Sequence, residues 1–254
     1  MFRERTGDKR ERRAIMVAIN KNAVQTQAVR IGVPSAELEA DVATPAEAKG
    51  IVLFAHGSGS SRHSSRNRFV AHVLNDAGLA TVLMDLLTEE EERAEQFTRH
   101  LRFDIGLLAG RLAGAIDWLA EQEATRALAV GLFGASTGGA AALVAAAERA
   151  QRVRAVVSRG GRPDLADDAL PLVRAATLLI VGGADEQVIA LNEEAFERLT
   201  CVKRLTIVPG ATHLFEESGA LEAVARMAAD WFKECLGVHV SALSETARWT
   251  ERNL

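Results

Sequence analysis

Short apolar runs alternate with longer segments whose apolar residues recur at helical spacing between residues 50 and 236. Runs that are apolar at every position are typical of strands buried on both faces of a parallel sheet. The segments between them then form helices that cover the two faces, so the alternation predicts an α/β fold. The predicted strands are 50–55, 79–84, 127–133, 153–158, 177–181 and 204–208, and the predicted helices are 67–76, 103–123, 137–150, 189–199 and 220–235.

The chain before the first apolar run has a different pattern. Segments 28–33 and 36–42 alternate in polarity and predict a β-hairpin that turns near Pro34. Residues 1–22 are rich in arginine and lysine, which predicts a flexible leader; an arm that binds nucleic acid is the alternative. Residues 23–236 form the predicted domain, and the tail 237–254 is expected to pack on that domain or on a second subunit in a homodimer.

Composition limits the class of protein and its partners. A chain of 254 residues with 48% hydrophobic residues can bury one sizeable core, and its net charge of −4 provides no strong field for nucleic acid or an anionic membrane. Cys201 and Cys235 form no close pair of the metal-binding type and predict free thiols. No apolar run approaches the roughly 20 residues of a membrane span and no signal peptide is apparent, so we expect a cytoplasmic protein without a membrane partner.

A serine framed by glycines lies where a predicted strand meets a predicted helix. Gly134-Ala135-Ser136-Thr137-Gly138 follows the strand at 127–133, and the helix begins at Thr137. This context is typical of a nucleophile elbow, a sharp turn that exposes the serine hydroxyl and leaves no room for side chains at the glycines. The N–H groups at the start of the helix point toward the site where an oxyanion would form. Ser136 is therefore the predicted nucleophile.

Two further titratable residues follow the ends of later strands, where the working groups of open α/β sheets gather. Asp185 lies beyond the strand at 177–181, and His213 lies beyond the strand at 204–208. A serine hydroxyl needs an imidazole as general base, and the imidazole needs a carboxylate to hold its tautomer. The order serine, aspartate, histidine is that of α/β-hydrolases. The alternatives to Asp185 are Asp164 and Glu186, and those to His213 are His72, His100 and His239.

The loop after the strand at 50–55 is rich in glycine. It reads His56-Gly57-Ser58-Gly59, and it lacks the lysine and the following serine or threonine of a nucleotide-binding loop. A flexible turn or a phosphate cradle is the alternative to an oxyanion loop. We predict that the backbone N–H groups of Ser58 and Thr137 form the oxyanion hole, and that His56 supports the loop through hydrogen bonds.

These residues together resemble a known group of enzymes. The motif at 134–138, the stretches 55–67 and 158–165, Asp185 and His213 resemble the small dienelactone-hydrolase-like members of the α/β-hydrolase superfamily, over about residues 28–236. The resemblance implies an α/β-hydrolase fold, in which a mostly parallel sheet of about eight strands has helices on both faces and the first hairpin at its antiparallel edge. Dienelactone hydrolases carry a cysteine nucleophile. Ser136 in its place favours ordinary ester hydrolysis.

The short connection 159–176 leaves no room for the large cap domain that many α/β-hydrolases insert there, so we expect an open cleft. Arg159 and Arg162 lie in this connection, and Arg62 and Arg66 follow the oxyanion loop. One hypothesis is that some of these arginines bind a carboxylate or phosphate of the substrate. The alternative is that they pair with nearby acidic residues and brace the loops.

The sequence thus predicts a lidless serine hydrolase that cleaves carboxylic esters, thioesters or lactones through an acyl-enzyme. The small-molecule ester would be attacked by Ser136, with His213 as base and Asp185 orienting it, and no metal or organic cofactor is needed. An acyltransferase or a dienelactone-type lactone hydrolase would use the same triad. A non-catalytic binding module with this fold is the alternative from another class.

Overall fold

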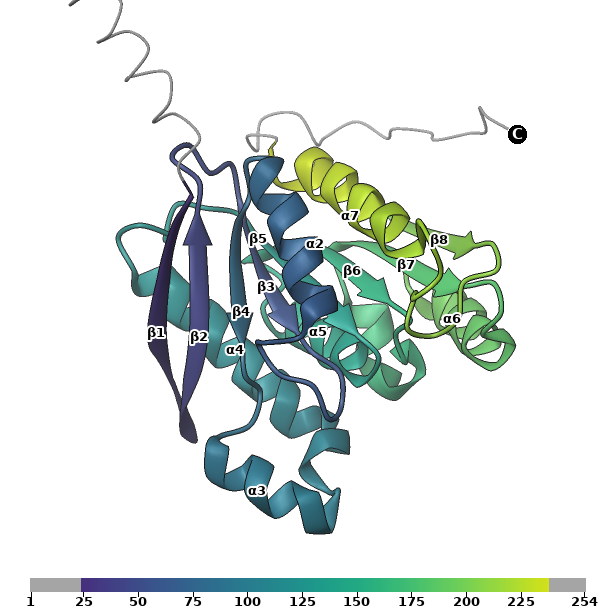
Figure 1. Ribbon diagram of the computed structural model, residues 1–254, viewed down its shortest axis with the longest axis horizontal. Helices are drawn as coiled ribbons and strands as arrows, with labels where there is room; N and C mark the ends of the chain where they lie inside the picture. Colours follow the sequence, from purple (N-terminus) through teal and green to yellow (C-terminus); the bar gives the residue numbers. More distant parts are fainter. Residues whose placement is uncertain (1–23, 238–254) are drawn as a thin grey trace, which may run out of the picture.

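The computed structural model describes residues 24–237, which fold around one eight-stranded sheet (Figure 1). The strand order is β1-β2-β4-β3-β5-β6-β7-β8; β1 and β2 form an antiparallel hairpin, β2 is antiparallel to β4, and all other neighbours are parallel. The predicted mostly parallel sheet with an antiparallel edge is confirmed. The strands are β1 (Gln25–Val33), β2 (Ala36–Thr44), β3 (Ile51–Ala55), β4 (Ala80–Met84), β5 (Val130–Ala135), β6 (Val153–Arg159), β7 (Ala176–Gly182) and β8 (Lys203–Val208).

Helices cover both faces of the sheet, as predicted. The apolar sides of α4, α5, η3 and α6 contribute to one hydrophobic cluster, and those of α2 and α7 contribute to the other. In Figure 1, α2 and α7 lie side by side in front of the sheet. The helices on the first face are α4 (Ile105–Glu121), α5 (Thr137–Glu148), η3 (Pro163–Leu172) and α6 (Glu186–Arg198), and those on the second are α2 (Ser65–Asp76) and α7 (Ala220–Leu236).

The strand β3 shows why its sequence is apolar at every position. Leu53 belongs to the cluster beneath α4 and α5, whereas Val52 and Phe54 belong to the cluster beneath α2 and α7. Successive side chains of a strand point to opposite faces, and here both faces are covered by helices. Full burial of all five residues of β3 follows from this arrangement.

An additional helix, α3 (Glu89–Thr98), follows β4 and projects from the lower edge of the molecule in Figure 1. Thr88 and Glu91 form a capping box at its start, and the acidic side chains of residues 89–92 occupy its first turn. After Arg99, the chain forms the short η2 (Leu101–Phe103) before α4 begins at Ile105. The predicted helix over 103–123 therefore began too early, because Asp104 caps α4 by accepting a hydrogen bond from the N–H of Leu107 at 2.9 Å.

The carboxylate of Glu95 holds α3 and η2 together. Its side chain is fully buried and accepts hydrogen bonds from Thr98, from Nε of Arg102 at 2.8 Å, and from the N–H groups of His100, Leu101 and Arg102. Burial opposes its ionisation, but these donors outweigh burial and hold the pKa of Glu95 far below its usual range. The corner between the two helices is thus fixed by one ionised side chain.

Other predicted boundaries shift by a few residues. β5 begins at Val130 and not at 127, because residues 122–128 form hydrogen-bonded turns, one of them from the N–H of Arg126 to the carbonyl of Gln122 at 2.8 Å. The connection from β6 to β7 contains only η3, so no large cap domain covers this part of the molecule. The predicted leader 1–22 and most of the predicted tail lie outside the described residues. Cys201 and Cys235 are free thiols. Among residues 24–237, no helix has both the length and the apolarity that a bilayer span requires.

Candidate active site

Ser136 lies at the sharp turn between β5 and α5 and has a strained backbone, with φ 50° and ψ −123°. A side chain at this positive φ costs free energy that the surrounding structure must supply. The two glycines of the motif make the turn possible. A Cβ at Gly134 would lie 2.5 Å from the carbonyl oxygen of Gly138, and a Cβ at Gly138 would lie 2.2 Å from the carbonyl oxygen of Ala55. Ser136 therefore has the geometry of a nucleophile elbow.

Asp185 and His213 meet at the ends of β7 and β8. Oδ2 of Asp185 lies 2.7 Å from Nδ1 of His213, with 17% of the Asp185 side chain and 39% of the His213 side chain exposed. This contact leaves Nε2 of His213 as the nitrogen available to a nucleophile. The alternative acids lie elsewhere: Asp164 is paired with Arg162, and Glu186 begins α6.

The segment after β6 connects the serine to the histidine. The N–H of Ser136 donates to the carbonyl of Arg159 at 3.4 Å, and the N–H of Arg162 donates to the carbonyl of Ser136 at 3.1 Å. Gly160 has a φ of +50°, and a Cβ there would lie 3.1 Å from the carbonyl oxygen of His213. Only glycine fits this close approach without strain. Within residues 24–237, no hydrogen bond involves Oγ of Ser136.

Phe215 fixes the loop that carries His213, and nothing in the sequence pattern pointed to it. Its ring is 1% exposed, its φ is 56°, and its N–H donates to the carbonyl of Thr212 at 3.2 Å. The backbone of Phe215 lies in the left-handed region, and the packing of its buried ring holds that backbone conformation in place. The ring belongs to the second hydrophobic cluster, and its neighbours there anchor the loop.

The predicted oxyanion residues lie next to each other. The N–H of Ser58 donates to Oγ1 of Thr137 at 3.1 Å, and a Cβ at Gly57 would lie 3.1 Å from Cβ of Ser136. The loop 56–59 therefore passes directly over the elbow. The backbone N–H of Thr137 belongs to the first turn of α5, where it has no partner within the helix.

His56 holds this loop through both ring nitrogens. Its Nδ1 lies 3.0 Å from the carbonyl oxygen of Gly57, and its Nε2 lies 3.0 Å from the backbone nitrogen of Leu86. Because an N–H must donate to the imidazole at Nε2, the proton of the neutral ring is on Nδ1. Burial lowers the pKa of His56, although hydrogen bonding and the charges of Asp85 and Glu92 oppose this effect.

A buried arginine extends the support of His56 into the core. Nη1 of Arg111 donates to the carbonyl of Leu86 at 2.6 Å, and the guanidinium is also paired with Glu91 at 2.5 Å. Arg111 is 2% exposed, and its hydrogen bonds to Glu91 lower the pKa of that carboxyl. The peptide of Leu86 is thus held on one side by Arg111 and on the other by His56.

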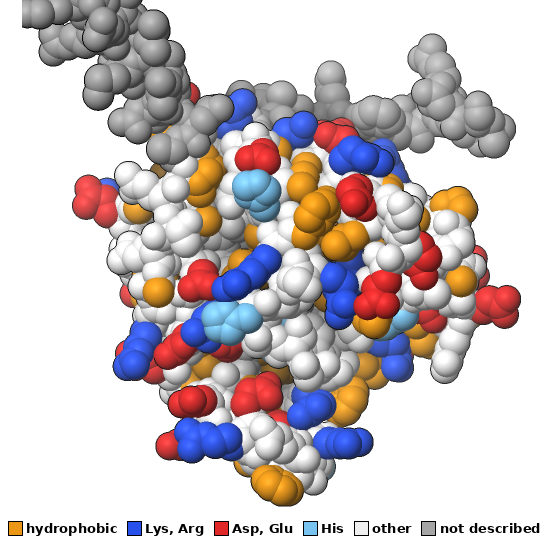
Figure 2. Space-filling model, viewed as in Figure 1, with side chains coloured by type: hydrophobic (Ala, Val, Ile, Leu, Met, Phe, Trp, Pro, Cys, Tyr) orange, Lys and Arg blue, Asp and Glu red, His pale blue; other side chains and the backbone are white. Residues whose placement is uncertain are grey.

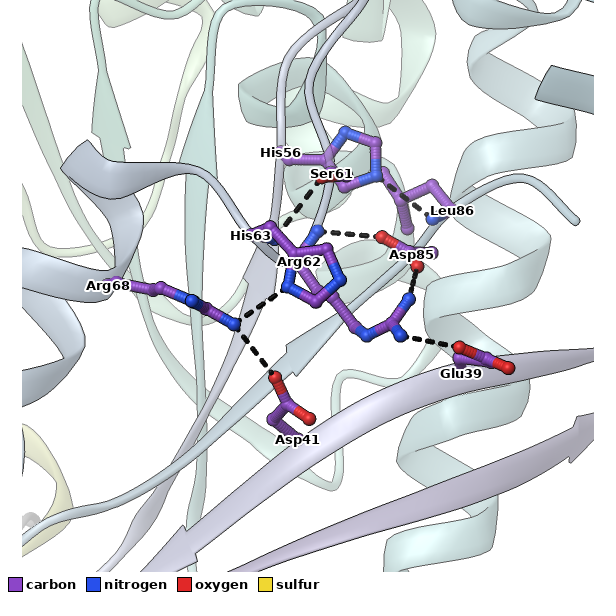
Figure 3. A network of polar contacts seen from close by, with 9 residues as sticks. All are labelled: Glu39, Asp41, His56, Ser61, Arg62, His63, Arg68, Asp85 and Leu86. Carbon is purple, nitrogen blue, oxygen red and sulfur yellow. Dashed lines mark hydrogen bonds and ion pairs between the residues drawn. The ribbon is translucent and has the colours of Figure 1, made fainter. Parts of the chain in front are cut away.

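The rest of the oxyanion loop is tied to the antiparallel edge of the sheet (Figure 3). The backbone N–H of Arg62 donates to Asp85 at 2.7 Å, and its guanidinium contacts Asp85 and Glu39. Arg68 bridges Asp41 and the ring of His63. Acidic and basic side chains lie close to one another across this face of the molecule (Figure 2). The guanidinium of Arg62 is therefore paired with the carboxylates of Glu39 and Asp85.

Of the next two candidate arginines, Arg162 is also paired with an acidic residue, whereas Arg159 has no such partner among the described residues. The guanidinium of Arg162 makes two hydrogen bonds to Asp164, at 2.9 and 2.7 Å. Arg159 is 7% exposed, and its guanidinium lies 5.8 Å above the ring of Phe215. Within residues 24–237, Arg159 has no acidic partner and its buried Nε has no hydrogen bond. Burial, together with the nearby charge of Arg66, lowers the pKa of Arg159 to about 10.

A family model described as the dienelactone hydrolase family matches residues 38–238. The chain belongs to the dienelactone hydrolase family. It is similar to a dienelactone hydrolase from Anabaena variabilis of known structure, with 63% identity and a TM-score of 0.83 over 84% of this chain and 99% of that one. This membership identifies the chain as a hydrolase with the α/β-hydrolase fold.

Two other relatives extend the comparison. Est1E from Butyrivibrio proteoclasticus has a TM-score of 0.68 at 16% identity, covering 82% of this chain and 98% of that one, a likeness of fold alone. A Mycobacterium tuberculosis protein, provisionally named a phosphoribosyl transferase, is 62% identical over 188 residues, or 74% of this chain. The chain spans 42% of the length of that relative. Between residues 24 and 237, no group of three or more His, Cys, Asp or Glu side chains could hold a metal ion.

Proposed function

We propose that this dienelactone hydrolase family member cleaves carboxylic esters or thioesters through an acyl-enzyme on Ser136. The observation that carries this proposal is the 2.7 Å contact between Asp185 and His213, at the strand ends beside the strained serine. An aspartate that accepts from Nδ1 holds the imidazole in the tautomer in which Nε2 can take a proton. A binding module would not need this arrangement.

In the acylation step, Oγ of Ser136 attacks the carbonyl carbon while Nε2 of His213 takes the serine proton. The carbonyl π electrons move to the oxygen, and the backbone N–H of Thr137 would stabilise that oxyanion. The N–H of Ser58, predicted as the second donor, instead donates to Oγ1 of Thr137. When the tetrahedral intermediate collapses, the bond to the alcohol or thiol breaks. The leaving group takes the proton from His213.

In the deacylation step, water attacks the acyl carbon and gives its proton to His213. Collapse of the second tetrahedral intermediate releases the acid and returns the proton to Ser136. If an alcohol replaced water, the same residues would perform acyl transfer. An intramolecular ester would be opened in the same way, so lactone hydrolysis is the nearest alternative activity. No step requires a metal or an organic cofactor.

We further propose that the preferred esters carry an anionic group. Repulsion by the charge of Arg66 contributes to the lowered pKa of Arg159, and of these two arginines only Arg66 has an acidic partner among residues 24–237, Glu216 at 3.2 Å. The buried Nε atoms of both arginines have no hydrogen bond among the described residues. A carboxylate or phosphate between the two guanidinium groups would relieve this repulsion. Arg62 and Arg162 are neutralised by neighbouring acids, so the proposed anion site does not include them.

The name of the mycobacterial relatives suggests phosphoribosyl chemistry as a second candidate. These proteins are more than twice as long as the matched region, so this chain resembles only a part of them. Their name refers to the longer proteins. A phosphorylated sugar ester would still be an anionic ester. We therefore treat phosphate as one form of the proposed anionic group.

Hydrolysis of p-nitrophenyl esters tests the proposal. The purified chain should release p-nitrophenolate, and Ser136→Ala should lower kcat by about 10³-fold or more. A suitable control is Ser218→Ala, because Ser218 is exposed and precedes α7. If Ser136→Ala is as active as the unmodified chain, the serine mechanism is wrong.

A further inference from the structure

The hydroxyl group of Thr137 is buried beside the elbow and has one hydrogen-bonding position free. Thr137 is 3% exposed, and its Oγ1 accepts the N–H of Ser58 at 3.1 Å. A hydroxyl group that accepts one hydrogen bond still has its own proton to donate. Among residues 24–237, Oγ1 of Thr137 donates no hydrogen bond.

The position of this hydroxyl relates it to the reacting atoms. Thr137 directly follows Ser136 at the first turn of α5, and Ser58 lies on the loop that passes over Ser136. An oxyanion formed by attack of Ser136 must lie within hydrogen-bonding distance of the backbone N–H of Thr137. The Oγ1 atom already contacts the second predicted donor. The Thr137 hydroxyl therefore lies beside the predicted oxyanion hole, in contact with one of its two predicted donors.

The contact between Ser58 and Thr137 also changes what each group can do. While the N–H of Ser58 donates to Oγ1, it polarises the hydroxyl and makes that hydroxyl a stronger donor. The loop 56–59 is held by His56, so the contact is fixed from the side of Ser58 as well as from the helix. The two groups form a short chain of donors that ends at the Thr137 proton.

We propose that the Thr137 hydroxyl is a catalytic donor to the oxyanion, in addition to the backbone N–H of the same residue. This inference rests on the proposed function of the site. When Oγ of Ser136 bonds to the carbonyl carbon and its proton passes to His213, the carbonyl oxygen gains a negative charge. The Thr137 O–H donates to that oxygen without giving up its proton, and the N–H of Ser58 stabilises the hydroxyl from behind.

The test compares Thr137→Val with Thr137→Ser in the hydrolysis of p-nitrophenyl butyrate. Valine keeps the backbone N–H and the volume of the side chain but lacks the hydroxyl. Thr137→Val should lower kcat by about 100-fold with little change in KM, because the oxyanion exists only in the transition state. Thr137→Ser restores the hydroxyl and should stay within about threefold of the unmodified chain. The pH dependence of kcat should be the same in all three proteins.

A transition-state analogue distinguishes this role from a structural one. Phenylboronic acid forms a tetrahedral adduct with an active serine, and its inhibition constant should rise in Thr137→Val in parallel with the loss of kcat. A valine variant with unchanged kcat and unchanged boronate affinity would overturn the inference, as would an increase in kcat. If the unmodified chain neither hydrolyses the ester nor binds the boronate, the proposed function itself fails. The two failures are therefore distinguishable.

Discussion

The carboxylate of Asp185 lies 2.7 Å from Nδ1 of His213, although the two residues are 28 positions apart in the sequence. Each residue follows the carboxyl end of its own strand, and β7 and β8 are parallel neighbours. Parallel pairing of these strands brings both loops to the same edge of the sheet. The elbow carrying Ser136 reaches that edge from β5, so the fold brings the loops of three residues distant in sequence to one edge of the sheet.

Replacement of Asp185 by asparagine should impair the histidine without changing the shape of the site. The amide can donate to Nδ1 and favour the wrong tautomer, so kcat for p-nitrophenyl butyrate should fall by about 10³- to 10⁴-fold. Glu186→Gln is the matched control because Glu186 is the next residue and begins α6. The control should retain activity within about twofold. Equal losses in both variants would contradict the assignment of Asp185.

Replacement of Arg159 by methionine tests the preference for anionic esters. The unmodified chain should prefer the mono-p-nitrophenyl ester of succinic acid over p-nitrophenyl butyrate, measured as a ratio of kcat/KM values. Arg159→Met should lower this ratio by about 10- to 100-fold, because a buried charged hydrogen bond is lost. In Arg162→Met the ratio should be unchanged, since Arg162 is paired with Asp164. An unchanged ratio in Arg159→Met would show that these arginines do not select the substrate.

The buried His56 should make folding stability depend on pH. Burial lowers its pKa in the folded state below the ordinary value of 6.5, so the unfolded chain binds the proton more readily. The stabilisation is complete above pH 6.5 and is lost as the pH falls through the folded-state pKa. Between about pH 8 and pH 5, the free energy of unfolding should decrease more in the unmodified chain than in His56→Gln, measured by urea denaturation.

His72→Gln is the control for that measurement. The side chain of His72 is 77% exposed on α2, so its removal should leave the pH dependence of stability unchanged. Glutamine at position 56 can still accept the N–H of Leu86 but does not titrate. Parallel stability curves for His56→Gln and the unmodified chain would mean that His56 does not contribute to the pH dependence.

Two glycines provide a matched test of the packing at the elbow. A Cβ at Gly138 would collide with the carbonyl of Ala55, whereas nothing lies within 4 Å of a Cβ at Gly110 on α4. Gly138→Ala should therefore destabilise the fold by about 3 kcal/mol, and Gly110→Ala should stabilise it by about 0.5–1 kcal/mol. Thermal and urea denaturation measure both effects. A Gly138→Ala variant as stable as the unmodified chain would contradict the tight turn.

The sequence predicted those parts of the fold that depend on local pattern. The parallel strands are buried on both faces and therefore continuously apolar, so their positions were within a few residues of β3 to β8. Element ends were less accurate. The start of α4 depends on the cap by Asp104, and the corner before it depends on the contacts of Glu95. Such boundaries depend on hydrogen bonds that the spacing of apolar residues does not predict.

For the candidate site, the predictable part was the position of residues at strand ends. Motif and strand order were sufficient to select Ser136, Asp185 and His213 as candidates. The pairing state of the arginines could not be predicted, because Arg62 and Arg159 differ only in the acids that the fold brings near them. The contact between Ser58 and Thr137 joins residues 79 positions apart and depends on how the loop crosses the elbow.

The central claim is that Ser136 is the nucleophile, and covalent labelling tests it most directly. The chain should react with a fluorophosphonate to give one adduct per molecule, and peptide mass spectrometry should locate that adduct on Ser136. Ser136→Ala should show no adduct, and His213→Ala should react far more slowly because the serine lacks its base. Absence of labelling in the unmodified chain, or equal labelling of Ser136→Ala, would contradict the account.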